Sequence, residues 1–282
     1  MTAGVFALVL AAALLHAGWN ALVKRADDPF LGMVAVCLWG GLFAAAILAF
    51  LPFPPSVAWP FLAGSILLHI GYFWLVGLVY RRADLSTAYP IMRGAAPAMT
   101  LGLSAWAVGE IPALGGVVGV ALLAGGVLAM GFSGGRAASV HALPMALAVS
   151  VSIALYTVVD AEGARLAGGG VGGAFAFNGV SDAGTGLGLV PLAALWRGPH
   201  IFREIGRRWP SGLAGGAAAF FGYATVIYAT TQAPIALVAA LRETSVLFAA
   251  LIGVFAFGET MGRTKAGALG LIVLGGAALR LL

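Results

Sequence analysis

The chain has 282 residues, of which 61% are hydrophobic and only 9% are charged. A water-soluble domain carries roughly 25% charged residues, so this composition excludes a soluble protein and indicates an integral membrane protein. In such a protein the net charge of +5 reports on orientation rather than on nucleic-acid binding.

Runs of about 20 apolar residues, each long enough to cross a bilayer as a helix, recur along the chain. The first run ends at Lys24 and Arg25 without a small-residue cleavage site, which predicts a retained helix rather than a signal peptide. Turns rich in glycine and proline separate the runs. We expect an all-α protein with ten transmembrane helices, at residues 4–23, 31–51, 60–80, 87–107, 113–132, 142–160, 172–195, 211–231, 234–256 and 265–282.

The second half of the sequence repeats the first. Arg93 precedes Glu110 by 17 residues, and Arg242 precedes Glu259 by the same interval. The segments GYFWLVGLVY and LLAGGVLAM of the first half correspond to GYATVIYATT and IVLGGAALR of the second. Each half holds five predicted helices, an odd number, so the second copy must enter the membrane upside down. This defines two domains, residues 1–136 and 137–282.

Basic residues support this inverted arrangement independently. The loop after the third helix carries Arg81 and Arg82, whereas the equivalent loop after the eighth has no basic residue. The bias is reversed after the fourth and ninth helices, where only the second copy carries Arg263 and Lys265. Most basic residues of the loops then lie on one face. The positive-inside rule makes this face cytoplasmic, which places both termini outside.

Ten helices in an inverted five-helix repeat, with Gly-Glu after the fourth helix of each half, resemble the drug/metabolite transporter superfamily. Within it the chain is most similar to the EamA-type exporters, over its whole length. The aromatic residues of the expected core resemble those of the YddG-type amino acid exporters. The resemblance implies export of small metabolites across the inner (plasma) membrane. Members usually keep both termini in the cytoplasm, so the family and the charges of this chain predict opposite orientations.

Charged residues inside predicted helices are the first candidates for function. Arg93 and Arg242 each lie about 10 Å from the start of a helix. Each either extends to the nearer interface or faces a cavity or a partner. We favour the second for both, because charged residues within membrane helices are costly, and Pro90 and Pro97 near Arg93 also free backbone carbonyls that need partners. Glu243 points about 100° away from Arg242 around the helix. It would bind substrate, carry a proton or form a structural ion pair.

Other polar residues divide into capping groups and helix stripes. Glu110 and Glu259 lie at turns before the fifth and tenth helices, where an acid caps a helix N-terminus. His16, Trp19 and Asn20 share one face of the first helix, and Tyr156 belongs to a matching stripe on the sixth. The residues expected to bind substrate are His16, Trp19, Asn20, Tyr72, Tyr89, Arg93, Tyr156, Tyr223, Arg242 and Glu243.

The sequence therefore predicts a secondary transporter with a central cavity lined by the first, third, fourth, sixth, eighth and ninth helices. Neutral and aromatic amino acids and methionine are the first candidate substrates, with other metabolites or drug-like compounds as the alternative. Nucleotide-binding, catalytic and metal-ligand motifs are absent, so we expect no ATP-driven transport, no enzyme activity and no cofactor or metal. Two rival functions remain: a membrane-embedded enzyme would need a converging catalytic set, and a channel would need a continuous polar pore. We expect a monomer in the lipid bilayer that binds a small molecule and no nucleic acid.

Overall fold

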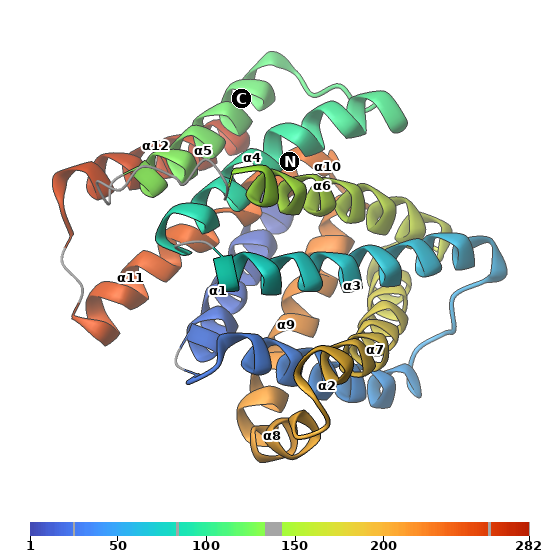
Figure 1. Cartoon of the computed structure of the whole chain (residues 1–282). Helices are drawn as coiled ribbons and strands as arrows, with labels where there is room; N and C mark the ends of the chain where they lie inside the picture. The colour runs from blue at the N-terminus through green and yellow to red at the C-terminus, as the bar shows by residue number, and fades with distance from the viewer. Residues whose placement is uncertain (25, 83–84, 133–142, 259–260, 282) are drawn as a thin grey trace. The chain divides into compact units, whose positions relative to one another are not determined.

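The computed structural model describes residues 1–24, 26–82, 85–132, 143–258 and 261–281 (Figure 1). Within these ranges the chain forms 12 α-helices and one 3₁₀-helix, and no β-strand. The elements are α1 (Ala3–Lys24), α2 (Pro29–Leu48), η1 (Ser56–Ala58), α3 (Trp59–Arg82), α4 (Leu85–Ala107), α5 (Leu114–Phe132), α6 (Leu143–Leu166), α7 (Gly170–Arg197), α8 (Ile201–Arg207), α9 (Trp209–Thr230), α10 (Ile235–Arg242), α11 (Ser245–Phe257) and α12 (Arg263–Leu281).

Each of the ten predicted ranges coincides with one helix, or with two in the case of the ninth. Among the described residues, 8 segments are long and apolar enough to cross a membrane, and α10 and α11 together make one of them. The helices α4 and α7 are not among these 8 segments. Arg93 and two prolines reduce the apolar character of α4, and polar residues such as Asn178 and Asp182 reduce that of α7. The all-α class is confirmed, while the number of ten spans stays a prediction.

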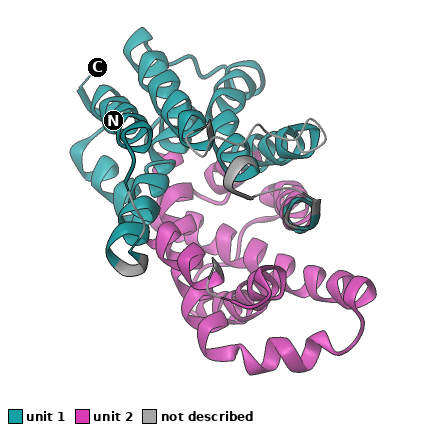
Figure 2. Cartoon of the chain, turned by 60° about the vertical axis from the view of Figure 1, so that its left-hand side comes forward, with its two compact units in different colours: residues 1–14, 75–158, 232–282 teal, residues 15–74, 159–231 magenta. Residues whose placement is uncertain are grey.

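The chain folds into two compact units (Figure 2). Unit 1 comprises residues 1–14, 75–158 and 232–282, and unit 2 comprises residues 15–74 and 159–231. Both units take segments from each predicted half of the sequence. A compact unit is defined by contacts and a repeat by similarity, so the two five-helix domains and their inversion stay predictions.

Glycines bring α5 and α12 together in unit 1, where these two helices run side by side (Figure 1). A Cβ atom added to Gly119 would lie 2.6 Å from the side chain of Leu279, and one added to Gly126 would lie 2.8 Å from that of Ile272. A Cβ atom on Gly275 of α12 would lie 2.7 Å from the backbone of α5. Membrane helices associate by such close van der Waals packing, because lipid provides little hydrophobic driving force between them.

In unit 2, α2 packs against both α7 and α9. A Cβ atom on Gly40 would lie 2.8 Å from the Cα of Gly216 in α9, so the two backbones touch. A Cβ atom on Gly186 of α7 would lie 2.5 Å from the carbonyl oxygen of Cys37. The start of α2 is fixed locally, because the Asp28 carboxylate accepts the N–H of Leu31 at 3.1 Å. Small residues and this cap thus make α2 the central helix of unit 2.

The glycines of the two predicted Gly-Glu turns both have a positive φ. Gly109 has φ 74° and Gly258 has φ 67°, in the left-handed region that glycine adopts without strain. The Glu110 carboxylate accepts the N–H of Ile235 at 2.7 Å. The capping role of Glu110 is confirmed at α10, whereas the sequence predicted it at α5, the next helix in the chain. The matching Glu259 lies outside the described residues.

The ninth predicted helix is interrupted near its middle. α10 ends at Arg242 and α11 begins at Ser245. The N–H groups of Glu243 and Thr244 bond to carbonyls three residues back, at 2.9 and 3.0 Å, rather than four. A tightened turn within a helix often marks a functional hinge or a strained segment. Here it places two charged residues, Arg242 and Glu243, at the interruption.

The short helix α8 was not predicted from the sequence. Ile201 and Ile205 are buried on one face, and the indole N–H of Trp39 donates to the carbonyl of Ile205 at 3.2 Å. On the other side, the Glu204 carboxylate accepts a hydrogen bond from Arg208 at 2.8 Å. This bond holds the pKa of Glu204 below its ordinary value. The segment IFREIGR is short and partly charged, so a search for apolar runs of membrane length does not find Ile201 and Ile205.

Candidate functional site

A buried ion pair lies in unit 1 at the interruption between α10 and α11. Nε of Arg93 lies 2.9 Å from Oε2 of Glu243, and the two side chains are 2% and 4% exposed. Arg242 is 9% exposed in the same segment. Arg93 therefore faces a protein partner rather than the membrane interface. Of the roles open to Glu243, the structure contains the ion pair, which joins α4 to the α10–α11 turn.

Two tyrosines accompany this ion pair. Tyr89 lies one turn before Arg93 on α4 and interacts electrostatically with Arg93, Glu243 and Tyr156. Tyr156 on α6 is 2% exposed. On the other side of Arg93, Pro97 lacks the N–H that would bond to the Arg93 carbonyl in a regular helix. Five of the predicted substrate residues, Tyr89, Arg93, Tyr156, Arg242 and Glu243, thus come together within unit 1.

The remaining predicted substrate residues belong to unit 2. The rings of His16 and Trp19 meet edge to face with centroids 5.2 Å apart. The Asn20 side-chain amide donates to the His16 carbonyl at 2.7 Å, which ties the stripe together. Tyr72 contacts the neighbouring Phe73 at a centroid distance of 5.0 Å. The predicted shared cavity of the first and sixth helices stays a prediction.

A second polar cluster lies in unit 2 around Asp160. The hydroxyl of Tyr223 donates to Oδ2 of Asp160 at 2.5 Å, and Nε2 of His69 lies 3.8 Å from the same oxygen. The rings of His69 and Tyr223 are in edge contact, with centroids 5.6 Å apart. Nδ1 of His69 lies 3.0 Å from the carbonyl oxygen of Ser65, whose hydroxyl is 2.6 Å from that of Ser181. Four helices thus contribute to one buried polar cluster, in which the contact between His69 and Asp160 is longer than a hydrogen bond.

Asp182 has a structural partner next to this cluster. The Asn178 side-chain amide donates to Oδ2 of Asp182 at 3.0 Å and to the Phe220 carbonyl at 3.4 Å. The i, i+4 spacing on α7 lets the two side chains meet.

Comparisons with known proteins identify the fold and the family. Residues 141–280 match the EamA-like transporter family. The chain belongs to this family. It is a multi-pass membrane protein and a transporter of the drug/metabolite type, and EamA-like proteins are transporters rather than enzymes.

Solved structures extend the likeness to the whole chain. A crystal structure described only as that of a protein aligns with a TM-score of 0.75, covering 100% of this chain and 98% of the other. Its sequence identity of 20% shows a common fold and nothing finer. In all, 27 chains of solved structures match, whereas no curated protein does.

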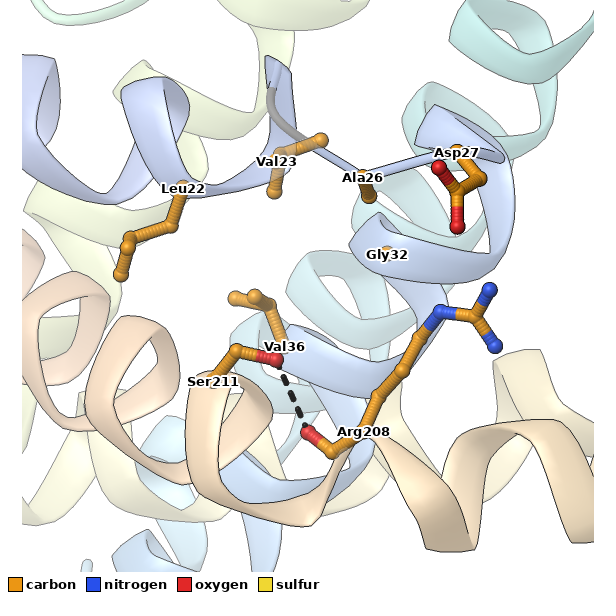
Figure 3. Close-up of a pocket in the computed structure, with 8 residues that line it drawn as sticks. All are labelled: Leu22, Val23, Ala26, Asp27, Gly32, Val36, Arg208 and Ser211. Atoms are coloured by element: carbon orange, nitrogen blue, oxygen red, sulfur yellow. Dashed lines mark hydrogen bonds between the residues drawn. The ribbon is translucent and has the colours of Figure 1, made fainter.

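The EamA-like transporter also has a small pocket in unit 2, between α1, α2 and α9 (Figure 3). Its volume is about 260 Å³, and it is lined by Leu22, Val23, Ala26, Asp27, Gly32, Val36, Arg208 and Ser211. The Ser211 hydroxyl donates to the Arg208 carbonyl at 3.1 Å. The structure describes all of the predicted substrate residues, and none of them lines this pocket. It is also below the roughly 300–1,000 Å³ of typical ligand sites, so we assign it no substrate role.

Sequence reasoning missed the cluster of the EamA-like transporter around Asp160. It assigned Tyr223 to substrate binding and did not connect it with His69 or Asp160. Three ionisable or hydroxyl groups on separate predicted helices were the available signal, since such groups are costly in a membrane unless they meet.

Proposed function

We propose that the protein is a secondary transporter that exports small zwitterionic metabolites across the inner (plasma) membrane by alternating access. Neutral and aromatic amino acids and methionine are the first substrates to test. The observation that carries this proposal is the buried Arg93–Glu243 pair beside Arg242, at an interrupted helix. Binding sites in inverted-repeat transporters form typically at discontinuous helices.

The chemistry of the pair suits an amino acid. A guanidinium binds a carboxylate with paired, charge-assisted hydrogen bonds, and a carboxylate accepts hydrogen bonds from an ammonium group. A zwitterion entering between Arg93 and Glu243 would replace each charge by one of the same sign. The buried charges therefore remain compensated while the substrate is bound. Such an exchange avoids the large cost of leaving either side chain alone in a dry site.

Neighbouring groups define a preference among zwitterions. Arg242 adds a second positive charge, which favours substrates with one free carboxylate over those with an additional cation. Tyr89 and Tyr156 offer flat apolar surfaces for an uncharged side chain, and aromatic pairs contribute roughly 0.5–1.5 kcal/mol beyond area burial. His16, Trp19, Asn20, Tyr72 and Tyr223 remain candidates for further substrate contacts.

Counterflow in liposomes tests this function. The purified full chain is reconstituted with each unlabelled amino acid inside, and entry of the labelled form is measured. We expect saturable exchange with neutral amino acids and none with lysine or arginine. Arg242→Ala should abolish exchange at normal expression. The matched control Arg280→Ala, on the exposed end of α12, should leave it intact. Exchange that survives Arg242→Ala would refute the assigned site, and no exchange with any amino acid would refute the substrate class.

A further inference from the structure

The small pocket between α1, α2 and α9 lies where three candidate membrane spans begin or end. The span of α1 ends at Val23, that of α2 begins at Pro29 and that of α9 begins at Trp209. The ends of membrane spans lie at the boundary between the lipid tails and water. The pocket therefore lies at the level of the phospholipid headgroups (Figure 3).

One side of this pocket is apolar and open toward lipid. Leu22 and Val36 line it, and Leu22 is 39% exposed. Trp209, which follows the lining residue Arg208 in the chain, is 53% exposed. Tryptophan is enriched at the headgroup level of a bilayer, where its ring is half in lipid and half in water. A phospholipid can thus approach the pocket with its tails against the protein surface.

Arg208 presents a free pair of N–H donors to the pocket. Its Nη1 atom donates to the Glu204 carbonyl at 3.0 Å and to the Glu204 carboxylate at 2.8 Å. Within the described ranges, Nε and Nη2 have no hydrogen-bond partner. These two atoms form one edge of the planar guanidinium, with parallel N–H groups that match two oxygens of a phosphate. The bonds to Glu204 also fix the direction of that edge.

Asp27 contributes a carboxylate to the same pocket. Figure 3 shows this carboxylate and the Arg208 guanidinium toward one end of the pocket, with Leu22 toward the other. The carboxylate has no hydrogen bond or ion pair with any part of the chain that the structure describes, Arg208 included. A cation and an anion thus face one pocket without pairing with each other. This arrangement is complementary to a ligand that carries both a phosphate and an ammonium group.

The other charged groups around the pocket are paired or positive. Asp28, next to Asp27, caps α2 and is already part of an ion pair. Arg203 and Arg207 are exposed on α8, and Arg207 lies 3.3 Å from Glu204. Their positive potential attracts a phosphate, as basic segments beside membrane helices do. Asp27 remains available to an ammonium group.

We propose that this pocket binds the headgroup of phosphatidylethanolamine from the surrounding bilayer. The phosphate accepts hydrogen bonds from Nε and Nη2 of Arg208, and the ammonium group donates to the Asp27 carboxylate. The lipid tails lie along the apolar side of the pocket, next to Leu22. A volume of about 260 Å³ is small for a whole ligand, but only the headgroup enters it. The bound lipid joins the α1–α2 turn to the junction of α8 and α9.

Headgroup chemistry separates this lipid from related molecules. The quaternary ammonium group of phosphatidylcholine has no N–H to donate to Asp27. Phosphatidylglycerol carries the phosphate without a cation, so it leaves the Asp27 carboxylate unpaired beside a second negative charge. Soluble phosphoethanolamine has both charges but no tails, so it makes no contact with the apolar side. The pocket should therefore prefer phosphatidylethanolamine to all three.

Native mass spectrometry of the delipidated full chain in detergent tests this preference. Equal amounts of phosphatidylethanolamine, phosphatidylcholine and phosphatidylglycerol compete for the protein. We expect the first to bind about tenfold more tightly than the second, which lacks one charge-assisted hydrogen bond. Asp27→Asn, a change at an exposed residue that should not affect folding, should remove this difference. Arg208→Gln should weaken the binding of all three lipids.

The matched control is Arg263→Gln, which removes an exposed arginine at the start of α12 and outside the pocket. It should leave the lipid preference unchanged. Equal binding of the three lipids by the unaltered protein, or a preference for phosphatidylglycerol, would overturn the inference. So would a preference that survives Asp27→Asn, or displacement of the lipid by soluble phosphoethanolamine. None of these measurements involves transport, so each of these outcomes leaves the proposed function standing.

Discussion

Removing one partner of the Arg93–Glu243 pair should destabilise the protein far more than removing both. Arg93→Met removes the ion-pair partner 2.9 Å from the buried Glu243 carboxylate, and Glu243→Gln removes the same partner from the buried Arg93 guanidinium. The double variant Arg93→Met/Glu243→Gln carries neither charge. We expect each single variant to unfold at a clearly lower temperature, and the double variant to unfold close to the unaltered protein.

The magnitude follows from the geometry of the pair. At 2.9 Å and an effective dielectric constant of about 20, two unit charges attract by about 6 kcal/mol. Desolvation of the two groups costs several kcal/mol each, so the intact pair contributes little net stability. Loss of one partner forfeits the attraction but keeps the burial of the other charge. This costs about 3–5 kcal/mol, or a fall in Tm of roughly 6–20 °C.

Thermal unfolding in detergent, followed by tryptophan fluorescence, measures these differences. Glu204→Gln is the control, because it breaks the partly exposed ion pairs of Glu204 with Arg207 and Arg208. Surface ion pairs contribute little, so its Tm should not change measurably. Single variants as stable as the unaltered protein, or a double variant with the summed loss of both, would refute the pairing. All three variants at Arg93 and Glu243 should be inactive in counterflow if the pair binds substrate.

Four further predictions test other parts of the molecule. Glu110→Ala should lower the free energy of unfolding by about 1.5–3 kcal/mol, since it removes the charged acceptor of the first N–H of α10. An unchanged Tm would show that this cap is not formed. Gly40→Ala should destabilise the protein by about 1–3 kcal/mol, because the added methyl group meets the backbone of α9. The control Gly267→Ala has open space around it and should leave the stability unchanged. Equal Tm values for the two variants would contradict the packing of α2 against α9. Trp19→Ala should weaken transport of aromatic substrates more than that of alanine or threonine, and equal effects on both would remove Trp19 from the substrate contacts. A C-terminal alkaline phosphatase fusion should be active and a fluorescent protein fusion dark if both termini are outside, and the reverse pattern would favour the orientation usual in the family.

Much of the helical framework could be predicted from the sequence. A membrane helix needs about 20 apolar residues because a bilayer core is roughly 30 Å thick, and this requirement acts on each segment independently. The predicted range 113–132 and the observed α5, Leu114–Phe132, agree for this reason. Turn and cap conformations likewise depend on residues close by in the sequence. The Asp-Pro sequence at Asp28 caps α2, and the glycines at positions 109 and 258 adopt the turn conformations expected after their helices.

Two local features were nevertheless beyond the sequence pattern. No proline or glycine marks the interruption at Glu243 in the sequence. The backbone keeps right-handed helical dihedrals through the tightened turn, so neither residue is needed there. The helix α8 buries only Ile201 and Ile205, which is too little apolar length for a membrane criterion.

Pairing between distant residues was decided only by the tertiary structure. The sequence predicted an ion pair as one role of Glu243 without its partner, and nothing local favoured Arg93 over Arg242, the neighbour of Glu243 in the chain. Likewise, an acid at the start of α5 was expected to cap that helix, yet Glu110 reaches α10. Which side chains meet depends on which helix backbones can approach, and glycine contacts such as that of α5 with α12 set this approach. Apolar length determines that a helix forms, whereas complementary surfaces on separate helices determine which charges it brings together.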